Sequence, residues 1–137
     1  MNIHQQAIGK LFLTYNWYSD RLKKSVAPYD ITTQQFNVLR ILQGQYPRPS
    51  TVSFVKETML DKMCDASRIV DRLVQKKLII KDNNSRDKRA VDIIISEKGL
   101  SLLERIDHEV SIPDIISKNL TLKEAQELNQ LLDKVRG

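Results

Sequence analysis

The sequence predicts a mainly α-helical protein with one small β-hairpin, arranged as a winged helix-turn-helix with further helices on both sides. Three observations carry this prediction: a short basic helix that follows a tight turn, two short apolar strands directly after it, and an amphipathic pattern at both ends of the chain. A chain of 137 residues is long enough for one hydrophobic core and too short for two. We therefore expect a single domain, in which about residues 31–96 form the winged lobe and about residues 1–30 and 97–137 form dimerisation helices.

The first expected helix covers residues 3–26 and carries apolar side chains at helical spacing, with Leu13 and Trp17 off the main stripe. A helix that is apolar on more than one face needs two partners, and in a chain of this size we expect one partner to be a second copy. Thr32 and Gln35 have the spacing of a capping box, which predicts a helix that runs to Gly44.

The helix-turn-helix is expected over residues 52–75. A short helix at about residues 52–59 is followed by a turn at residues 60–63, and a basic helix begins near Asp65. Its apolar stripe lies at positions 69, 70, 73 and 74, with Lys and Arg on the remaining faces.

Two strands and two more helices complete the expected fold. The strands are expected at Leu78–Ile80 and Val91–Ile95, around a polar tip at residues 83–89. Ser96 has the position of a helix N-cap, Pro113 interrupts that helix, and a capping box at Thr121 opens a last amphipathic helix.

The positive charge of the chain is concentrated in the helix and hairpin. The whole chain has a net charge of +5. Residues 62–89 hold nine basic and four acidic side chains, whereas residues 97–137 hold six basic and eight acidic ones. Such a basic patch attracts phosphates without regard to sequence, although charge alone would also fit a solvated lysine-rich face.

A basic helix that leads into a basic-tipped hairpin is a shape suited to duplex DNA. The helix fits the major groove, and the hairpin can reach the adjoining minor groove or the backbone. We therefore expect double-stranded DNA as a partner. The alternative is a winged helix used for protein contact or for non-specific nucleic-acid binding.

The same stretch resembles the MarR family of bacterial winged-helix transcription regulators. The resemblance rests on the order of helices and on three short motifs, Asp71-Arg72-Leu73, Asp87-Lys88-Arg89 and Ser96-Glu97-Lys98-Gly99. Members of the family usually carry glycine as a left-handed cap where the recognition helix ends, whereas this chain has Lys77. The family's third helix usually includes a Leu-Ala pair, and here it reads Phe54-Val55-Lys56-Glu57.

The resemblance implies a homodimer whose N- and C-terminal helices intertwine. Two recognition helices would then enter successive major grooves of a pseudo-palindromic operator, about 34 Å apart. A repressor is favoured over an activator because blocking a promoter needs no additional surface.

Residues for DNA binding follow from their positions. At the start of the recognition helix, Arg68 matches the guanine edge, with phosphate contact as the alternative, and Asp65 alternatively caps the helix. Arg72 is expected to contact phosphate or to pair with Asp87. The resemblance implies that Asp87 holds the wing by an ion pair and that Arg89 enters the minor groove. The full set is Ser50, Thr51, Lys62, Asp65, Ala66, Ser67, Arg68, Arg72, Arg86, Lys88 and Arg89.

Five aromatic residues are candidates for a small-molecule pocket between the dimerisation helices and the DNA-binding lobe. Many members of the family bind phenolic or other aromatic effectors there, so the resemblance implies a small aromatic effector. The alternative is that most of these rings belong to the core or the dimer interface. The candidates are Tyr15, Trp17, Tyr18, Tyr29 and Phe36.

Other functional classes find little support in the sequence. The two histidines, His4 and His108, lie far apart without metal-ligand spacing, and there is no glycine-rich phosphate loop or nucleophile elbow. We expect no enzyme activity, no metal and no cofactor. Cys64 cannot form an internal disulfide, which fits a reducing cytoplasm; we read it as a small half-buried residue, with a regulatory thiol as the alternative. The N-terminus lacks signal-peptide order, and no apolar run is long enough to span a membrane.

Overall fold

The computed structural model describes residues 2–83 and 91–137. The helices are α1 (Ile3–Val26), the 3-10 turn η1 (Ala27–Tyr29), α2 (Thr33–Gln45), α3 (Val52–Thr58), α4 (Ala66–Gln75), α5 (Glu97–Glu109), α6 (Asp114–Ser117) and α7 (Leu122–Arg136), and the strands are β1 (Ile79–Asn83) and β2 (Val91–Ile95). A mainly helical chain with one hairpin after its helix-turn-helix confirms the predicted fold class.

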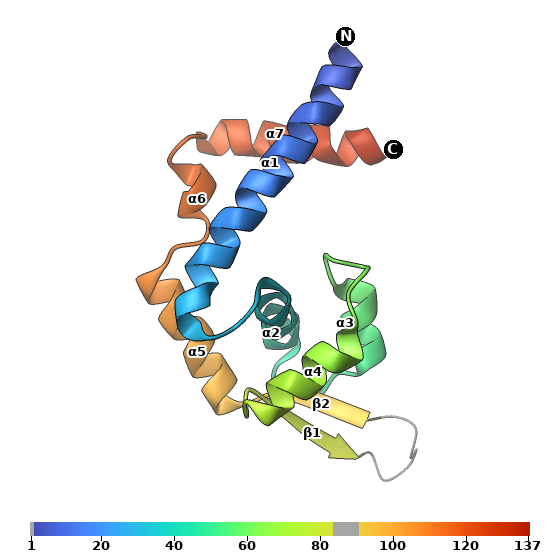
Figure 1. Ribbon diagram of the computed structural model, residues 1–137, viewed down its shortest axis with the longest axis vertical. Coiled ribbons are helices and arrows are strands. Elements are labelled where there is room, and N and C mark those ends of the chain that lie inside the picture. The colour runs from blue at the N-terminus through green and yellow to red at the C-terminus, as the bar shows by residue number, and fades with distance from the viewer. Residues whose placement is uncertain (1, 84–90) are drawn as a thin grey trace.

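The protein consists of a small lobe on a long helical arm (Figure 1). The lobe holds α2, α3, α4 and the hairpin. The arm consists of the N-terminal part of α1 together with α6 and α7, and α5 leads from the lobe to α6. The N-terminal part of α1 reaches far beyond the lobe, in the region of the picture that also contains α7. None of the helices in the described part of the chain is long and apolar enough to cross a membrane.

Local signals fix where the helices begin. Thr32 and Gln35 exchange side-chain and backbone hydrogen bonds of 3.1 Å each, which is the predicted capping box. Thr121 and Glu124 do the same at the start of α7, with distances of 3.0 and 3.1 Å. Ser96 caps α5 by accepting a hydrogen bond from the backbone N–H of Gly99 at 3.0 Å.

The hydrophobic core lies within the lobe and against α5. Its members come from α2 (Phe36, Val38, Leu39, Leu42), α3 and α4 (Val55, Ala66, Val70, Leu73), the hairpin (Ile79, Ile93, Ile95), α5 (Leu103, Ile106) and neighbouring segments (Val26, Ile31, Met59, Leu78). Helix α7 contributes no buried residue, so the hydrophobic core does not extend to α7.

The hairpin pairs β1 with β2 in antiparallel register, with Ile79 opposite Ile95 and Asp82 opposite Asp92. The predicted first strand, Leu78–Ile80, begins one residue before β1. It also ends three residues before β1 does, because β1 continues through Asn83, which the sequence analysis placed in the tip. An isolated antiparallel β-bridge joins Ser50 to Ile93 of β2. Each of the two residues donates its backbone N–H to the carbonyl oxygen of the other at 2.8 Å.

Candidate nucleic-acid interface

The exposed face of α4 is a continuous polar stripe. Ala66, Val70 and Leu73 point into the core. The opposite face carries exposed side chains at i, i+1, i+4, i+5 and i+8, namely Ser67, Arg68, Asp71, Arg72 and Gln75. Ten residues of α-helix are about 15 Å long, which suits a helix that lies in the major groove of DNA.

The start of α4 is fixed by Asp65, whose carboxylate accepts a hydrogen bond of 3.2 Å from the backbone N–H of Arg68. Asp65 is therefore the N-cap, as the capping interpretation predicted. Arg68 and Ser67 lie in the first turn and are exposed, so both side chains can reach a ligand in front of this helix end.

Two of the expected DNA-contacting residues, Ala66 and Ser50, are buried instead. Ala66 is only 4% exposed and its side chain packs within the lobe, so it does not face outward as predicted. Ser50 is 7% exposed because its backbone pairs with Ile93 of β2. Its hydroxyl is therefore not presented on an exposed helix end, contrary to the prediction that Ser50 belongs to the DNA-binding set.

Two further expected residues, Thr51 and Lys62, form hydrogen bonds at the two ends of α3. The Thr51 hydroxyl accepts a hydrogen bond of 3.1 Å from the Phe54 N–H and so begins α3. The Lys62 ammonium donates a hydrogen bond to the carbonyl oxygen of Glu57 near the end of α3. Lys62 is exposed, and its positive charge remains next to the start of α4.

An ion pair joins the recognition helix to the hairpin. The Lys81 ammonium on β1 lies 3.4 Å from the Asp71 carboxylate on α4. Both side chains are largely exposed, so the pair contributes at most about 1 kcal/mol to stability. Its electrostatic effect is local: Lys81 offsets the single carboxylate on the polar stripe of α4. The sequence analysis missed Lys81 and Gln75, although continuing the i+4 spacing from Asp71 would have found Gln75.

The expected contacts of the wing tip lie outside the described residues. These are Arg86, Asp87, Lys88 and Arg89, together with the expected pair between Arg72 and Asp87. Their roles remain predictions from the sequence.

The end of α4 is tied down by hydrogen bonds in a Schellman arrangement. Lys77 has a φ of 65°, in the left-handed region. Its N–H donates to Val74, and the N–H of Leu78 donates to Leu73, both at 2.9 Å. Lysine thus occupies the left-handed cap that glycine usually supplies.

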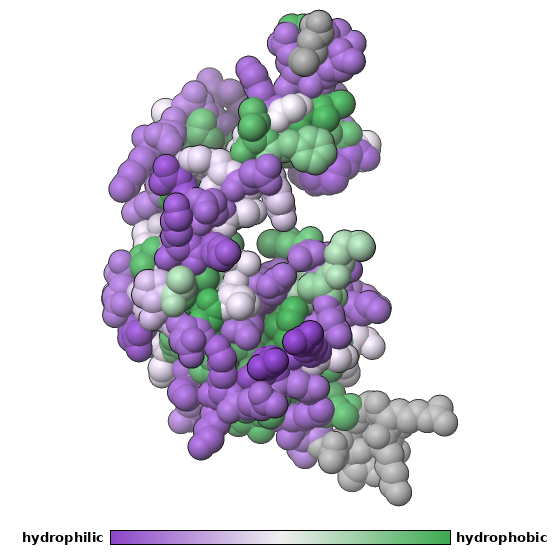
Figure 2. Space-filling model, in the orientation of Figure 1, coloured by the Kyte–Doolittle hydropathy of each residue, from purple (hydrophilic) through white to green (hydrophobic). Residues whose placement is uncertain are grey.

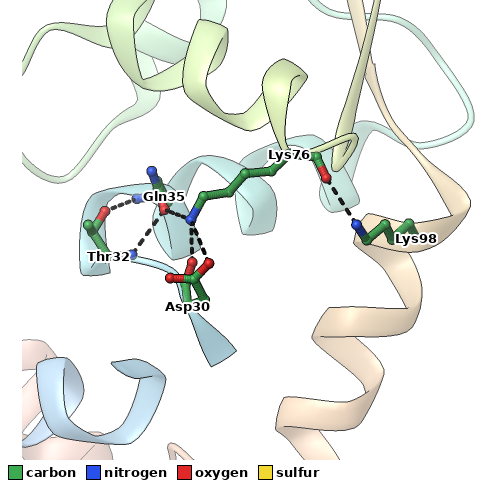
Figure 3. Close-up of polar contacts among 5 residues, drawn as sticks. All are labelled: Asp30, Thr32, Gln35, Lys76 and Lys98. Carbon is green, nitrogen blue, oxygen red and sulfur yellow. Dashed lines mark hydrogen bonds and ion pairs between the residues drawn. The ribbon is translucent and has the colours of Figure 1, made fainter. Parts of the chain in front are cut away.

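The start of α5 completes this cap. The Ser96 hydroxyl donates to the carbonyl oxygen of Lys77 at 2.7 Å, and the Lys98 ammonium donates to that of Lys76 at 3.2 Å (Figure 3). Gly99 fits closely beneath, since a Cβ there would lie 2.5 Å from the carbonyl oxygen of Leu78. The Ser-Glu-Lys-Gly motif therefore holds the C-terminal end of the recognition helix against α5.

The five candidate aromatic residues do not meet in one pocket. Phe36 is 7% exposed and belongs to the core. Tyr15 and Tyr18 line a groove of about 250 Å³ between α1 and α2, closed on one side by Leu60 and Asp61. Tyr29 lines a different cleft, of about 470 Å³, with Lys76, Lys98 and Arg105, and Trp17 lines a third hollow beside α6. A single aromatic pocket is therefore wrong for the chain as described.

Tyr29 is held by polar contacts at the side of its cleft. Its hydroxyl donates a hydrogen bond of 2.6 Å to the Glu109 carboxylate, which raises the pKa of Tyr29. The guanidinium of Arg105 lies over the Tyr29 ring, 5.0 Å from the ring centroid.

Cys64 is half-buried, as expected, just before α4. Its Sγ donates to the carbonyl oxygen of Asp61 at 2.9 Å. Burial raises the pKa of the Cys64 thiol, and the charges of Asp61 and Asp65 act in the same direction. A raised pKa favours the unreactive thiol. Among the described residues, no cluster of side chains has the composition of a metal site.

A basic helix with an exposed polar face, a hairpin joined to it and a capped helix-turn-helix define a winged-helix DNA-binding protein. No model of a protein family matches the chain. The chain is similar to the multiple antibiotic resistance protein MarR of Escherichia coli, with 31% identity over 132 residues that cover 93% of this chain and 90% of MarR. It is 28% identical to the HTH-type transcriptional regulator MhqR of Bacillus subtilis, over 92% of this chain and 89% of MhqR.

A solved structure agrees over the whole length. A crystal structure of a mutant E. coli MarR complexed with operator DNA has a TM-score of 0.78 and 29% identity, and the match covers 98% of this chain and 99% of that chain. The chain belongs to the MarR family. It is thus a DNA-binding transcription regulator rather than an enzyme.

Proposed function

We propose that the protein is a repressor that binds a pseudo-palindromic operator as a homodimer and is released by a small aromatic effector. The exposed polar stripe of α4, with Arg68 and Arg72, is the observation that carries the DNA-binding part of the proposal. Ser67, Lys62 and, from the sequence, Arg86, Lys88 and Arg89 extend the same basic surface.

The homodimer is proposed because the arm exposes large apolar side chains that are not covered by the described part of the chain. On α7, Leu122, Leu131 and Val135 are 79%, 60% and 67% exposed. On α1, Phe12 and Leu13 are 67% and 71% exposed. Figure 2 shows green, hydrophobic surface in the upper part of the molecule, where Figure 1 places α7 and the N-terminal part of α1. A helix of 15 residues without tertiary packing is marginal in water, so burial of both helices against a second copy would stabilise the arm.

The oligomeric state is tested by changing the arm alone. Leu131→Glu places a charge on the apolar face of α7 and is expected to produce monomers, whereas Gln130→Glu adds the same charge on the polar face and should leave the dimer intact. Light scattering of both variants reads the result. A Leu131→Glu variant that stays dimeric would exclude α7 from the interface.

The DNA-binding part is tested by selecting bound duplexes from a random pool at two salt concentrations. The proposal expects an enriched inverted repeat whose half-sites lie about one helical turn apart. Salt-sensitive binding without an enriched motif would support the alternative of a non-specific nucleic-acid binder, and no binding would support a protein-contact module.

Arg68 is proposed to read a base. Arg68→Ala should relax the preference at one operator position per half-site, at a cost of about 1–3 kcal/mol. Arg105→Ala, which removes the same charge from α5 outside the stripe, is the matched control and should leave the preference unchanged. If Arg68→Ala weakens binding equally for every sequence, Arg68 contacts phosphate instead.

The effector is proposed to bind beside α1, in the groove of about 250 Å³ that is lined by the aromatic side chains of Tyr15 and Tyr18. A flat aromatic ring can stack on such side chains. Tyr18→Ala should therefore abolish the release of operator DNA by substituted phenols without weakening DNA binding. Unchanged release in this variant would remove the groove from the proposal.

A further inference from the structure

Lys76 connects the end of the recognition helix to the base of the arm. Its ammonium donates a hydrogen bond to the carbonyl oxygen of Asp30, where η1 ends, and a longer one of 3.4 Å to Oε1 of Gln35 in α2 (Figure 3). The Asp30 carboxylate lies 3.8 Å from the same ammonium. The side chain of the C-cap residue of α4 thus contacts both segments that follow α1.

The acceptors of Lys76 are held in place by the backbone. Asp30 has left-handed dihedral angles, φ 59° and ψ 38°, and its N–H donates to Ala27. Gln35 is 9% exposed, and its Oε1 also accepts the Thr32 N–H at 3.1 Å in the capping box of α2. The ammonium therefore binds a preformed pair of oxygens at the junction of α1 and α2.

The hydrogen bonds of the Lys76 ammonium, rather than its ion pair with the Asp30 carboxylate, define this contact. The side chain of Asp30 is fully exposed, so its charge is screened by water, and a pair of this kind contributes little free energy. The backbone of Lys76 is bonded too, since its carbonyl oxygen accepts the Lys98 ammonium of α5 at 3.2 Å. Lys76 therefore joins α4 to both helices that lead into the arm, α1 through η1 and α5 directly.

We propose that Lys76 is a positioning residue that sets the orientation of the recognition helix relative to the arm, and thereby the spacing at which the dimer reads its two half-sites. The inference rests on the proposed dimer. Arg68 is eight residues from Lys76, or about 12 Å along the helix. A rotation of about 10° about this junction moves a point at that distance by about 2 Å, and the two protomers together would shift by more than one base-pair rise of 3.4 Å.

The test removes the donors of Lys76 and keeps its aliphatic stem, in Lys76→Met. Lys77→Met is the matched control, because it removes the same charge from the next residue, whose side chain makes none of these contacts. Dissociation constants are measured for inverted repeats in which the half-site separation changes by single base pairs.

The wild-type protein and Lys77→Met are expected to lose at least about tenfold in affinity for each base pair away from the best spacing. This factor is about the cost of one mismatched base pair in a binding site. Lys76→Met should reduce this discrimination several-fold while retaining its affinity at the best spacing, and Lys76→Arg should restore it. A wild-type spacing profile in Lys76→Met overturns the inference. A uniform loss of affinity with a smaller salt dependence also overturns it, because Lys76 would then contact phosphate.

A second measurement does not depend on an operator. Spin labels at Lys23→Cys on α1 and Ser53→Cys on α3, in a Cys64→Ser background, report the distance between arm and lobe when labelled chains are mixed with excess unlabelled chains. Lys76→Met should broaden this distance distribution, and an unchanged distribution overturns the inference. If the selection yields no inverted repeat, the proposed function fails, and the label distances still decide whether Lys76 positions the lobe. If Lys76→Met does not fold, Lys76→Gln replaces it in both experiments, because glutamine also lacks the ammonium and has a shorter side chain.

Discussion

Replacing Lys77 with glycine is expected to stabilise the protein, because Lys77 has a backbone conformation that side chains disfavour. Its φ is 65°, and the left-handed region costs a residue with a Cβ about 1–2 kcal/mol. Glycine adopts this conformation freely but loses more backbone entropy on folding, by about 0.5–1 kcal/mol. The difference predicts that the free energy of unfolding rises by about 0.5–1 kcal/mol in Lys77→Gly.

The substitution preserves the hydrogen bonds of the cap. The N–H of residue 77 donates to Val74 and its carbonyl oxygen accepts from Ser96, at 2.9 and 2.7 Å. Both groups belong to the backbone, so glycine can keep them. The lysine side chain is exposed, and its removal leaves no cavity.

Urea denaturation at a fixed protein concentration measures the effect, since the stability of a dimer depends on concentration. Lys77→Ala is the control, because alanine removes the charge and keeps the Cβ, and should therefore gain nothing. A Lys77→Gly variant no more stable than Lys77→Ala would refute the assignment of left-handed strain to this residue. An equal gain in both variants would assign the effect to charge.

Two further predictions concern Gly99 and Glu124. Gly99→Ala places a Cβ 2.5 Å from the backbone of Leu78 and should lower the free energy of unfolding by about 1–3 kcal/mol. In the control Gly44→Ala, in α2, the added Cβ meets nothing within 4 Å, so this variant should not be destabilised. Equal effects of the two substitutions in urea denaturation would contradict the close fit at Gly99. Hydrogen bonds from Thr121 lower the pKa of Glu124, so its contribution to α7 is complete above the unfolded pKa of about 4.3 and is lost as pH falls through the folded value. Glu124→Gln should make the helical circular dichroism signal depend less on pH between about pH 6 and 3. An unchanged acid transition would contradict a role of Glu124 in the pH dependence of α7.

The features that could be predicted from the sequence depend on residues close together in the chain. A capping box joins residues three apart, so Thr32 and Gln35 could be paired without knowing the fold. The apolar stripe of α4 is likewise a local pattern, and Val70 and Leu73 lie in the core as expected. The position of Asp65 as a cap follows from the same turn of helix.

The features that were missed depend on long-range contacts. Ser50 is buried because it pairs with Ile93 on β2, and β1 extends to Asn83 because β2 supplies partners that far. The acceptors of Lys76 come from a different helix junction, which no local spacing reveals. At Lys77 the local signal was misleading, since the Schellman hydrogen bonds impose the left-handed conformation on a lysine.

The register of the hairpin gives it one face that repels a polyanion. Asp82 lies directly opposite Asp92, and because side chains alternate along a strand, both carboxylates share the face that carries the exposed Ile80. The other face carries the core residue Ile79 and Lys81, which reaches Asp71 on α4. A duplex that approached the carboxylate face would meet two like charges, while one on the α4 side meets a lysine first. The register of the hairpin therefore disfavours the approach of DNA to the carboxylate face.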